Sequence, residues 1–458
     1  MKFKLPLLLL LISFSASSII AQTDSAMIKK IFDEALRNGK SYSNLDYLSN
    51  KIGGRLSGSP QAQQAVEWAF KAMKEAGADT VYLQECMVPH WVRGEKESAK
   101  IINSGSNKFN IVPICALGGS ICTPDEGITA QVLEVKSFDD LTKLGREKVE
   151  GKIIFFNCPM DPTLFETFDA YSNVFMYRWA SASAAAKLGA VGVLVRSLSL
   201  KQDDNPHTGV MAYKDSISKI PACAISTNAA NLLSENLKTD ENLKFFFKMS
   251  CQTLPDEKSY NVVGEIRGSS KTNEYIVVGG HLDSWDTGKG ANDDGSGVVQ
   301  SIEVIRIFKA LGIKPKCTIR AVAFMNEENG GRGGKKYAAL AKLNNEKHIA
   351  AIESDAGSFT PQGFSSDVTP QAKAKLKSWR PLFEPYGIYN FDRDGSGSDI
   401  GSLKDAGVPC MELMPDSQRY FDYHHTATDV FENVNKRELE LGGAAMAALI
   451  WMISQYGL

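Results

Sequence analysis

Glu274-Tyr-Ile-Val-Val-Gly-Gly-His-Leu-Asp-Ser-Trp-Asp286 is the stretch of this 458-residue chain that decides its fold. Its apolar half, residues 274–279, predicts a buried β-strand that ends directly at His281. The acidic string Asn292-Asp-Asp-Gly-Ser-Gly297 follows, and a helical pattern then runs over residues 297–311. A buried strand followed by a helix is the repeating unit of a parallel sheet covered on both faces.

The same alternation continues towards the C-terminus. The pattern predicts strands over residues 318–325, 348–352 and 408–413, with a helix over 335–343 between the first two. We therefore expect an α/β fold with a mostly parallel central sheet covered by helices. The carboxyl ends of parallel strands share one edge of a sheet, where functional sites of such folds lie.

The N-terminus is typical of a signal peptide over residues 1–21. A basic start at Lys2 and Lys4 precedes an apolar run, and small residues lead to Ala21. This pattern predicts a secreted or periplasmic protein. The apolar run over 441–453 is shorter than the roughly 20 residues that cross a bilayer, so we expect a buried closing helix and no membrane span.

The remaining chain is longer than one typical domain. We expect residues 22–104 to form the N-terminal part of the main domain, with a helix that begins after Ser59. Residues 105–255 predict a second α/β unit inserted into that domain, and residues 256–458 its main part. His207, alone in a polar loop of the insertion, is predicted to be a surface residue.

Charge and cysteine content exclude several classes of protein. The 51 basic and 53 acidic residues give a net charge of −2, which favours neither nucleic acid nor anionic membrane as a partner. None of the eight cysteines forms a Cys-x-x-Cys pair, which excludes a zinc ribbon and a thioredoxin-like centre. Cys317 and Cys410 are predicted to be buried thiols, and disulfides among the other six stay open.

The chemistry-bearing residues form short strings, most of them directly after predicted strands. Three of the six histidines lie in these strings. The strings begin with His-x-Asp at 281–283 and Asn-Asp-Asp-Gly at 292–295, and continue with Glu327-Glu328, Glu353-Ser-Asp355 and His424-His-Thr-Ala-Thr-Asp429. Imidazole and carboxylate together are the donors of sites that bind two divalent cations and activate water.

Taken in this order, the strings resemble the co-catalytic di-zinc aminopeptidase family. His281 to Asp286, Glu353 to Gly357, Pro89-His-Trp91 and Gly58-Ser-Pro60 are similar to its carboxypeptidase Q-like branch. Each motif alone is weak, but five in the right order are strong evidence. The resemblance implies a zinc exopeptidase fold, with the inserted unit corresponding to a protease-associated domain.

The resemblance also implies two zinc ions per chain and the residues that hold them. Their ligands would be His281, Asp293, Glu328, Asp355 and His425. Asp293 would bridge the ions, and His425 is preferred to His424 because it directly precedes a threonine. Glu327 would be the general base and Asp283 would orient the His281 imidazole. A cis peptide between Asp293 and Asp294 is a further expectation.

The resulting hypothesis is an exported di-zinc metallo-exopeptidase. It would cleave the N-terminal bond of peptides or dipeptides with a free amine through a metal-bridging hydroxide, and a homodimer is the family expectation. A single-zinc glutaminyl cyclase-like transferase and a non-catalytic receptor or binding module of the same fold are the alternatives. The cyclase would lose part of the two-metal shell, and the binding module would lack ligands or the base, whereas all these positions are present.

Overall fold

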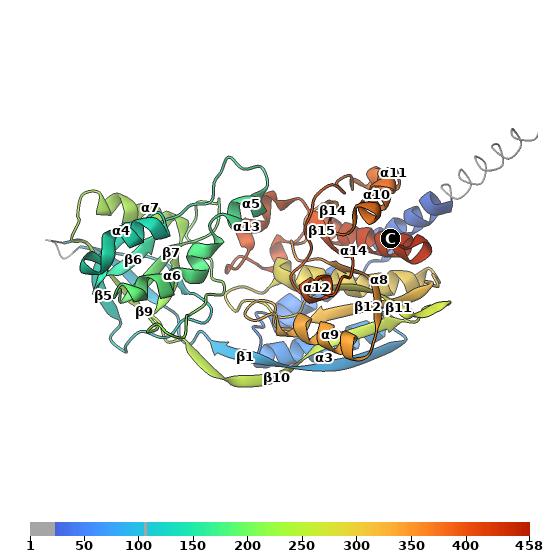
Figure 1. The fold of residues 1–458 in the computed structure, drawn as a ribbon, viewed down its shortest axis with the longest axis horizontal. Coiled ribbons are helices and arrows are strands. Elements are labelled where there is room, and N and C mark those ends of the chain that lie inside the picture. Colours follow the sequence, from blue (N-terminus) through green and yellow to red (C-terminus); the bar gives the residue numbers. More distant parts are fainter. Residues whose placement is uncertain (1–22, 105–107) are drawn as a thin grey trace, which may run out of the picture.

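The structure is a computed structural model that describes residues 23–104 and 108–458 (Figure 1). The predicted signal peptide, residues 1–21, lies outside this range. Among the described residues, no helix is both long and apolar enough to cross a membrane. The C-terminal apolar run lies in α14 (Lys436–Tyr456), whose side chains from Ala444 to Ile453 are buried or nearly so. The prediction of a closing helix is confirmed.

A seven-stranded sheet forms the centre of the molecule. In spatial order its strands are β1 (Thr80–Val92), β10 (Gln252–Ile266), β12 (Cys317–Phe324), β11 (Lys271–His281), β13 (Lys347–Glu353), β15 (Cys410–Pro415) and β14 (Pro361–Asp367). The four inner strands, β12, β11, β13 and β15, are parallel to their neighbours in this group. The outer three pair antiparallel.

The sheet is therefore mixed, and the prediction of a mostly parallel sheet is right only for its inner strands. The reason lies in the connections. Parallel neighbours need a crossover such as a helix, whereas antiparallel strands do not. The chain leaves the sheet along β1 and returns along β10 as one long ribbon, and β14 turns back alongside β15. The strand–helix alternation on which the prediction rested does not extend to these segments.

Helices cover both faces of this sheet. On β11, Ile276 and Val278 contribute to the core beneath α3 (Pro60–Glu75), α8 (Ser296–Ala310) and α14, because alternate side chains of a strand point to opposite faces. Val277, between them, packs with Tyr337 of α9 (Arg332–Leu343) on the other face. Ser59 caps α3 as expected, since its hydroxyl accepts a hydrogen bond from the nitrogen of Ala62 at 3.1 Å.

A second sheet forms from the chain between β1 and β10. Its eight strands are, in spatial order, β3 (Phe109–Ile111), β2 (Ser98–Ile102), β9 (Lys244–Lys248), β5 (Ile128–Val135), β6 (Ile153–Phe156), β7 (Gly192–Arg196), β8 (Ala222–Ile225) and β4 (Ile114–Ala116). Its helices are α4 (Phe138–Val149), α5 (Thr167–Ser172), α6 (Phe175–Lys187) and α7 (Thr227–Leu237). We call residues 98–248 the inserted module; Figure 1 shows it on the left.

The inserted module contacts the main domain through α5. Arg393 forms ion pairs with Glu166 and Asp169, at 2.8 and 2.7 Å. Tyr171 stacks on Phe421, with 4.8 Å between the ring centroids. Figure 1 shows α5 beside α13 (Tyr420–Tyr423), between the two sheets. The inserted module is thus fixed against the edge at which the inner strands end.

The eight cysteines are free thiols in the structure. Cys317 and Cys410 are buried, as predicted, and Cys122 is the exposed one. Burial raises the pKa of the Cys410 thiol to about 12, so this group stays protonated and unreactive at neutral pH.

Candidate active site

The predicted site residues meet at the carboxyl end of the inner strands. His281 is the last residue of β11, Glu327 and Glu328 follow the end of β12, and Asp355 follows the end of β13. Asp293 lies in the turn Ala291–Gly295 (η2) that leads into α8, and its peptide bond to the next residue is cis, as expected. Residues from four distant parts of the chain are therefore adjacent in space.

Asp293 lies at the centre of this group, with its two oxygens facing opposite ways. Oδ1 lies 3.2 Å from Nε2 of His281, which is also 3.3 Å from Oδ1 of Asp355. Oδ2 lies 3.2 Å from Nε2 of His425, which is also 3.1 Å from Oε2 of Glu328. Two clusters of donor atoms thus share one carboxylate.

Both imidazoles use their outer nitrogen for a hydrogen bond. Nδ1 of His281 lies 2.9 Å from the backbone oxygen of Asp283, and Nδ1 of His425 lies 3.2 Å from that of Thr208. A carbonyl oxygen only accepts, so each Nδ1 carries the proton and donates it. Each Nε2 then faces carboxylate oxygens and needs either a second proton or a cation between the acceptors.

The pKa values describe the site when protons occupy it. Burial opposes protonation of His425, but Glu328 and Asp293 outweigh it and raise the pKa of the imidazole to about 9. Burial likewise opposes protonation of His281, but Asp355 and Asp293 raise its pKa well above the usual range. Burial raises the pKa of Glu328 to about 8, and the carboxylate of Asp293 adds to the effect. At neutral pH both imidazoles of the metal-free cluster are therefore protonated, and a bound cation would take the place of these protons.

The donor set fits two divalent cations of the zinc type. The ligand atoms of His281, Asp293 and Asp355 lie within 4.8 Å of one another, as do those of Asp293, His424 and His425, so each group could hold one ion. Each cluster offers one imidazole and carboxylates, the donors that zinc prefers in catalytic sites. The observation that carries this fit is Oδ2 of Asp293, a buried oxygen with no hydrogen bond from any described residue.

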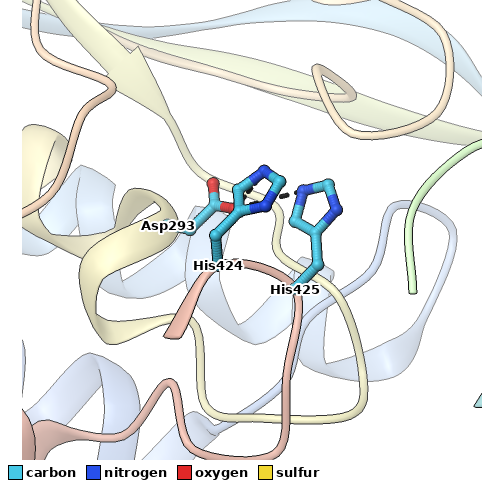
Figure 2. Close-up of side chains that lie close together, drawn as sticks. All are labelled: Asp293, His424 and His425. Carbon is cyan, nitrogen blue, oxygen red and sulfur yellow. Dashed lines mark ion pairs between the residues drawn. The ribbon is translucent and has the colours of Figure 1, made fainter. Parts of the chain in front are cut away.

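His424 also lies beside this centre (Figure 2). Its ring stacks on that of His425 with 3.5 Å between centroids. Its Nε2 is 3.8 Å from Oδ2 of Asp293, against 3.2 Å for His425, and only His425 also pairs with Glu328. The geometry therefore favours the histidine that directly precedes the threonine.

Asp283 contacts both His281 and the turn that carries Glu327. Its backbone oxygen accepts the hydrogen bond from His281, while its carboxylate is 3.9 Å from the ring. Oδ1 instead accepts hydrogen bonds from the backbone nitrogens of Asn326, at 2.6 Å, and Glu327, at 3.1 Å. Burial raises the pKa of this carboxyl to about 6, although His281 opposes the shift. Asp283 thus positions the turn that carries the glutamate pair.

Two further residues fix the backbone around Asp293. Asp429 accepts hydrogen bonds from the backbone nitrogens of Asn292, at 2.7 Å, and Asp293, at 3.1 Å, so it supports the segment that carries the central carboxylate. Arg55 is completely buried and donates to the carbonyl oxygens of Leu282, at 2.5 Å, and Gly290, at 2.9 Å. No local pattern singles out Arg55, since its partners are more than 200 residues away.

The prediction for His207 is wrong. It was predicted to lie at the surface, but only 2% of the residue is exposed, and burial lowers the pKa of its ring to about 3. It belongs to the stretch of the inserted module that reaches the cluster of histidine and carboxylate side chains, where the next residue, Thr208, bonds to His425. The polar residues around His207 predicted exposure, but in the structure the neighbouring polar side chains find partners inside the fold.

A cavity of about 560 Å³ opens onto the cluster. The inserted module contributes aromatic walls, Phe168, Tyr171, Phe175 and Trp179, and the main domain contributes Tyr420 and Phe421. Glu327 and Ser398 also line the cavity, together with Asp355 and His425. Tyr420 and Phe421 line the pocket and also pack in the core of the inserted module.

Comparisons with known proteins agree with this architecture. Peptidase family M28 matches residues 261–450. Carboxypeptidase Q of Mus musculus is 36% identical over 415 residues, which are 91% of this chain and 86% of that protein. A peptidase M28 precursor from Shewanella amazonensis, solved as a crystal structure, is 33% identical with a TM-score of 0.89, covering 95% of this chain and 97% of the other. A zinc aminopeptidase from Bacillus subtilis, 20% identical over 91% of this chain and 95% of its own, shares the fold with a TM-score of 0.65.

Proposed function

The chain belongs to peptidase family M28 and is a metallopeptidase, and we propose that it is an exported di-zinc exopeptidase that acts on peptides or dipeptides with a free N-terminus. The single observation that carries the proposal is the position of Asp293 between two clusters of donor atoms. The proposed signal peptide, residues 1–21, would be removed after Ala21. Intact mass of the protein recovered from outside the cytoplasm tests that cleavage.

Five residues would hold the two ions. His281 and Asp355 form one set, Glu328 and His425 the other, and Asp293 belongs to both. Zinc bound there would supply Lewis-acid activation of water and of the substrate carbonyl. Oε1 of Glu328 accepts a hydrogen bond from the nitrogen of Trp285 at 3.1 Å, which leaves Oε2 for the ion.

Glu327 would be the general base. Its side chain lines the cavity, and its backbone nitrogen is held by Asp283 at 3.1 Å, directly before the ligand Glu328. A carboxylate so placed can take the proton of the attacking water and pass it to the leaving amine. Asp283 would act as a positioning residue for both His281 and Glu327.

The cavity supports an exopeptidase rather than an enzyme that cleaves folded proteins. Its volume of about 560 Å³ accommodates a few residues, and the aromatic walls from α5 and α6 close one side. We assign the inserted module to the protease-associated type, with the role of narrowing access. The negative charge that Glu327 and Asp355 bring to the cavity lining suits the free amine of a substrate N-terminus.

The test combines zinc content with hydrolysis of dipeptides. The purified mature protein should contain about two zinc ions per chain, and chelation should abolish hydrolysis until zinc is restored. An N-acetylated copy of the same dipeptide should resist cleavage. One ion without hydrolysis would instead favour the cyclase-like transferase, and absence of metal a binding module. Light scattering of the same sample tests the predicted homodimer.

A further inference from the structure

We infer that the loop 207–209 of the inserted module is a structural part of the metal site formed by Glu328 and His425, with Thr208 as the positioning residue for His425. The inference rests on the proposed function, because it takes these two residues as ligands. It goes beyond access control, since it makes occupancy of one metal site depend on the inserted module.

Thr208 and His425 are joined by two hydrogen bonds across 217 positions of the chain. The backbone nitrogen of Thr208 donates to the backbone oxygen of His425 at 3.0 Å. Nδ1 of His425 donates back to the backbone oxygen of Thr208, 3.2 Å away. One residue of the inserted module therefore fixes both the main chain and the ring of the ligand, and directs Nε2 towards Glu328 and Asp293.

His425 depends on such a partner because its backbone is unusual. Its φ is +62°, a region that residues other than glycine avoid unless the surrounding structure holds them there. The ring stacks on His424 on one side and meets the edge of Trp285, 5.8 Å between centroids, on another. Those contacts restrict the ring plane, but the hydrogen bond to Thr208 selects which nitrogen points at the metal site.

Thr208 is itself anchored inside the inserted module. Its hydroxyl donates to the backbone oxygen of Ala116 at 2.8 Å. On either side, the nitrogen of His207 donates to the hydroxyl of Ser197 at 2.9 Å, and the oxygen of Gly209 accepts from the nitrogen of Gly118 at 2.9 Å. The loop is therefore bonded to the second sheet as well as to His425 of the main domain.

Arg178 of α6 completes the contact. This buried guanidinium lies beneath the loop, with Nη1 3.5 Å from the oxygen of Thr208 and 3.4 Å from Nδ1 of His425. Its Nη2 donates to the hydroxyl of Tyr171 at 2.7 Å. Any shift of the loop therefore changes the surroundings of the ligand ring.

The two proposed metal sites differ in which part of the chain supplies the hydrogen-bond partner of the histidine ring. His281 receives its outer partner from Asp283, two residues along the same chain segment, whereas His425 receives it from the inserted module. Removal of such outer partners typically lowers metal affinity by about 10–100-fold. Disturbing the loop should therefore weaken one zinc site and leave the other intact.

A matched pair of glycine variants tests this. Gly209 has φ +135°, and a Cβ there would lie 2.5 Å from the guanidinium carbon of Arg178, so Gly209→Ala must displace the loop or the arginine. Gly145 of the same module also has a positive φ, +69°, but a Cβ there meets nothing within 4 Å. Gly145→Ala therefore controls for the backbone penalty alone.

The measurement is zinc per chain in the full-length mature protein, after equilibration with zinc buffers of defined free concentration. Gly145→Ala should hold two ions, each with the affinity that it has in the wild type. Gly209→Ala should retain one ion at wild-type affinity and bind the second about 10–100-fold more weakly. Two ions at wild-type affinity in Gly209→Ala would overturn the inference and leave the proposed function standing. Absence of zinc in the wild type would overturn the proposed function itself.

A milder variant covers the case in which Gly209→Ala fails to fold. Thr208→Val keeps the shape of the side chain and the backbone atoms that face His425, but removes the hydroxyl that anchors the loop to Ala116. It should weaken the second zinc ion several-fold, with the first unchanged. Equal affinities in Thr208→Val and wild type would contradict the role of the loop.

Discussion

The carboxylate of Asp283 accepts a hydrogen bond from the backbone nitrogen of Glu327, with 3.1 Å between the two atoms. The segment that begins with one proposed ligand, His281, thus also holds the turn that carries the proposed base. Asn326, whose nitrogen binds the same oxygen at 2.6 Å, has φ +73°. Asparagine is one of the few non-glycine residues that adopt this conformation readily, and the two hydrogen bonds to the carboxylate hold the turn in it.

Replacing Glu327 by glutamine should abolish turnover without removing metal. The amide cannot take a proton from water, so we expect kcat to fall by about 10²–10⁴-fold. Glu328→Gln, one position along, should instead lose zinc, because its Oε2 lies 3.1 Å from Nε2 of His425 in the same cluster. Zinc analysis and dipeptide hydrolysis on both variants check this, and a Glu327→Gln variant with full activity would remove Glu327 from the mechanism.

Replacing Asp283 by alanine should lower kcat more than it changes KM. Two buried nitrogens, those of Asn326 and Glu327, would lose their acceptor, at a cost of about 1–3 kcal/mol each. Asp283→Asn keeps one oxygen at this place and should recover most of the loss. Steady-state kinetics on the pair distinguishes a positioning role from simple destabilisation. If asparagine behaved like alanine, the negative charge rather than the acceptor would be the relevant property.

Replacing Arg55 by methionine should destabilise the fold. Its guanidinium donates to the carbonyls of Leu282, Lys289 and Gly290, which methionine leaves unpaired in the interior. We expect a loss on the order of 3–5 kcal/mol in the free energy of unfolding. Urea unfolding with chelator present measures it without a contribution from zinc. Arg380→Met, which breaks a surface pair with Asp392, should change stability by less than about 1 kcal/mol.

Zinc binding should release protons at neutral pH. In the metal-free site the carboxylates outweigh the effect of burial and raise the pKa of His425 to about 9, so at pH 7 this ring carries an extra proton that zinc displaces. Calorimetric titration of the metal-free protein with zinc in two buffers of different ionisation enthalpy gives the number released. A heat of binding independent of the buffer would mean that the site is unprotonated before zinc arrives.

His348, at the opposite end of the sheet from the site, should make stability depend on pH. Burial, with the nearby Arg320, lowers the pKa of its ring from 6.5 to about 4. The folded state therefore prefers the neutral ring, which contributes stability that is complete above pH 6.5 and lost as the pH falls towards 4. The loss is on the order of 3 kcal/mol. Urea unfolding at several pH values should show a smaller acid effect in His348→Gln than in wild type, with chelator in both.

The sequence predicted that the histidine and acidic strings come together, because most of them follow strand ends, and the resemblance to the di-zinc family supplied the ligand set. His281, Glu328 and Asp355 each follow an apolar strand of the inner sheet, and parallel strands must end at one edge. The partners that orient these ligands follow no such rule. Thr208 and Arg55 reach the site from segments more than 200 positions away. Thr208 acts through its backbone carbonyl and Arg55 through a guanidinium that is buried only in the fold, so neither has a sequence signal.

The flanks of the sheet and the surroundings of His207 show the same limit. An apolar run indicates a strand, but its direction depends on where the chain goes next, and β10 returns antiparallel to β1 after a long insertion. A polar loop indicates exposure unless another module covers it. The stretch around His207 is covered, since the loop that follows lies against His425.

The strands that flank the inserted module are neighbours in the central sheet, because Trp91 pairs with Thr253 and Val92 with Gln252. A segment with adjacent ends can enter an ancestral hairpin by a single genetic event without disturbing the sheet around it. The hydrogen bonds between Thr208 and His425 would then tie such a segment to the candidate site. Chimeras that exchange this module between relatives should keep wild-type affinity for the second zinc ion only when the donor brings a matching loop, because that proposed site takes contacts from both parts of the chain.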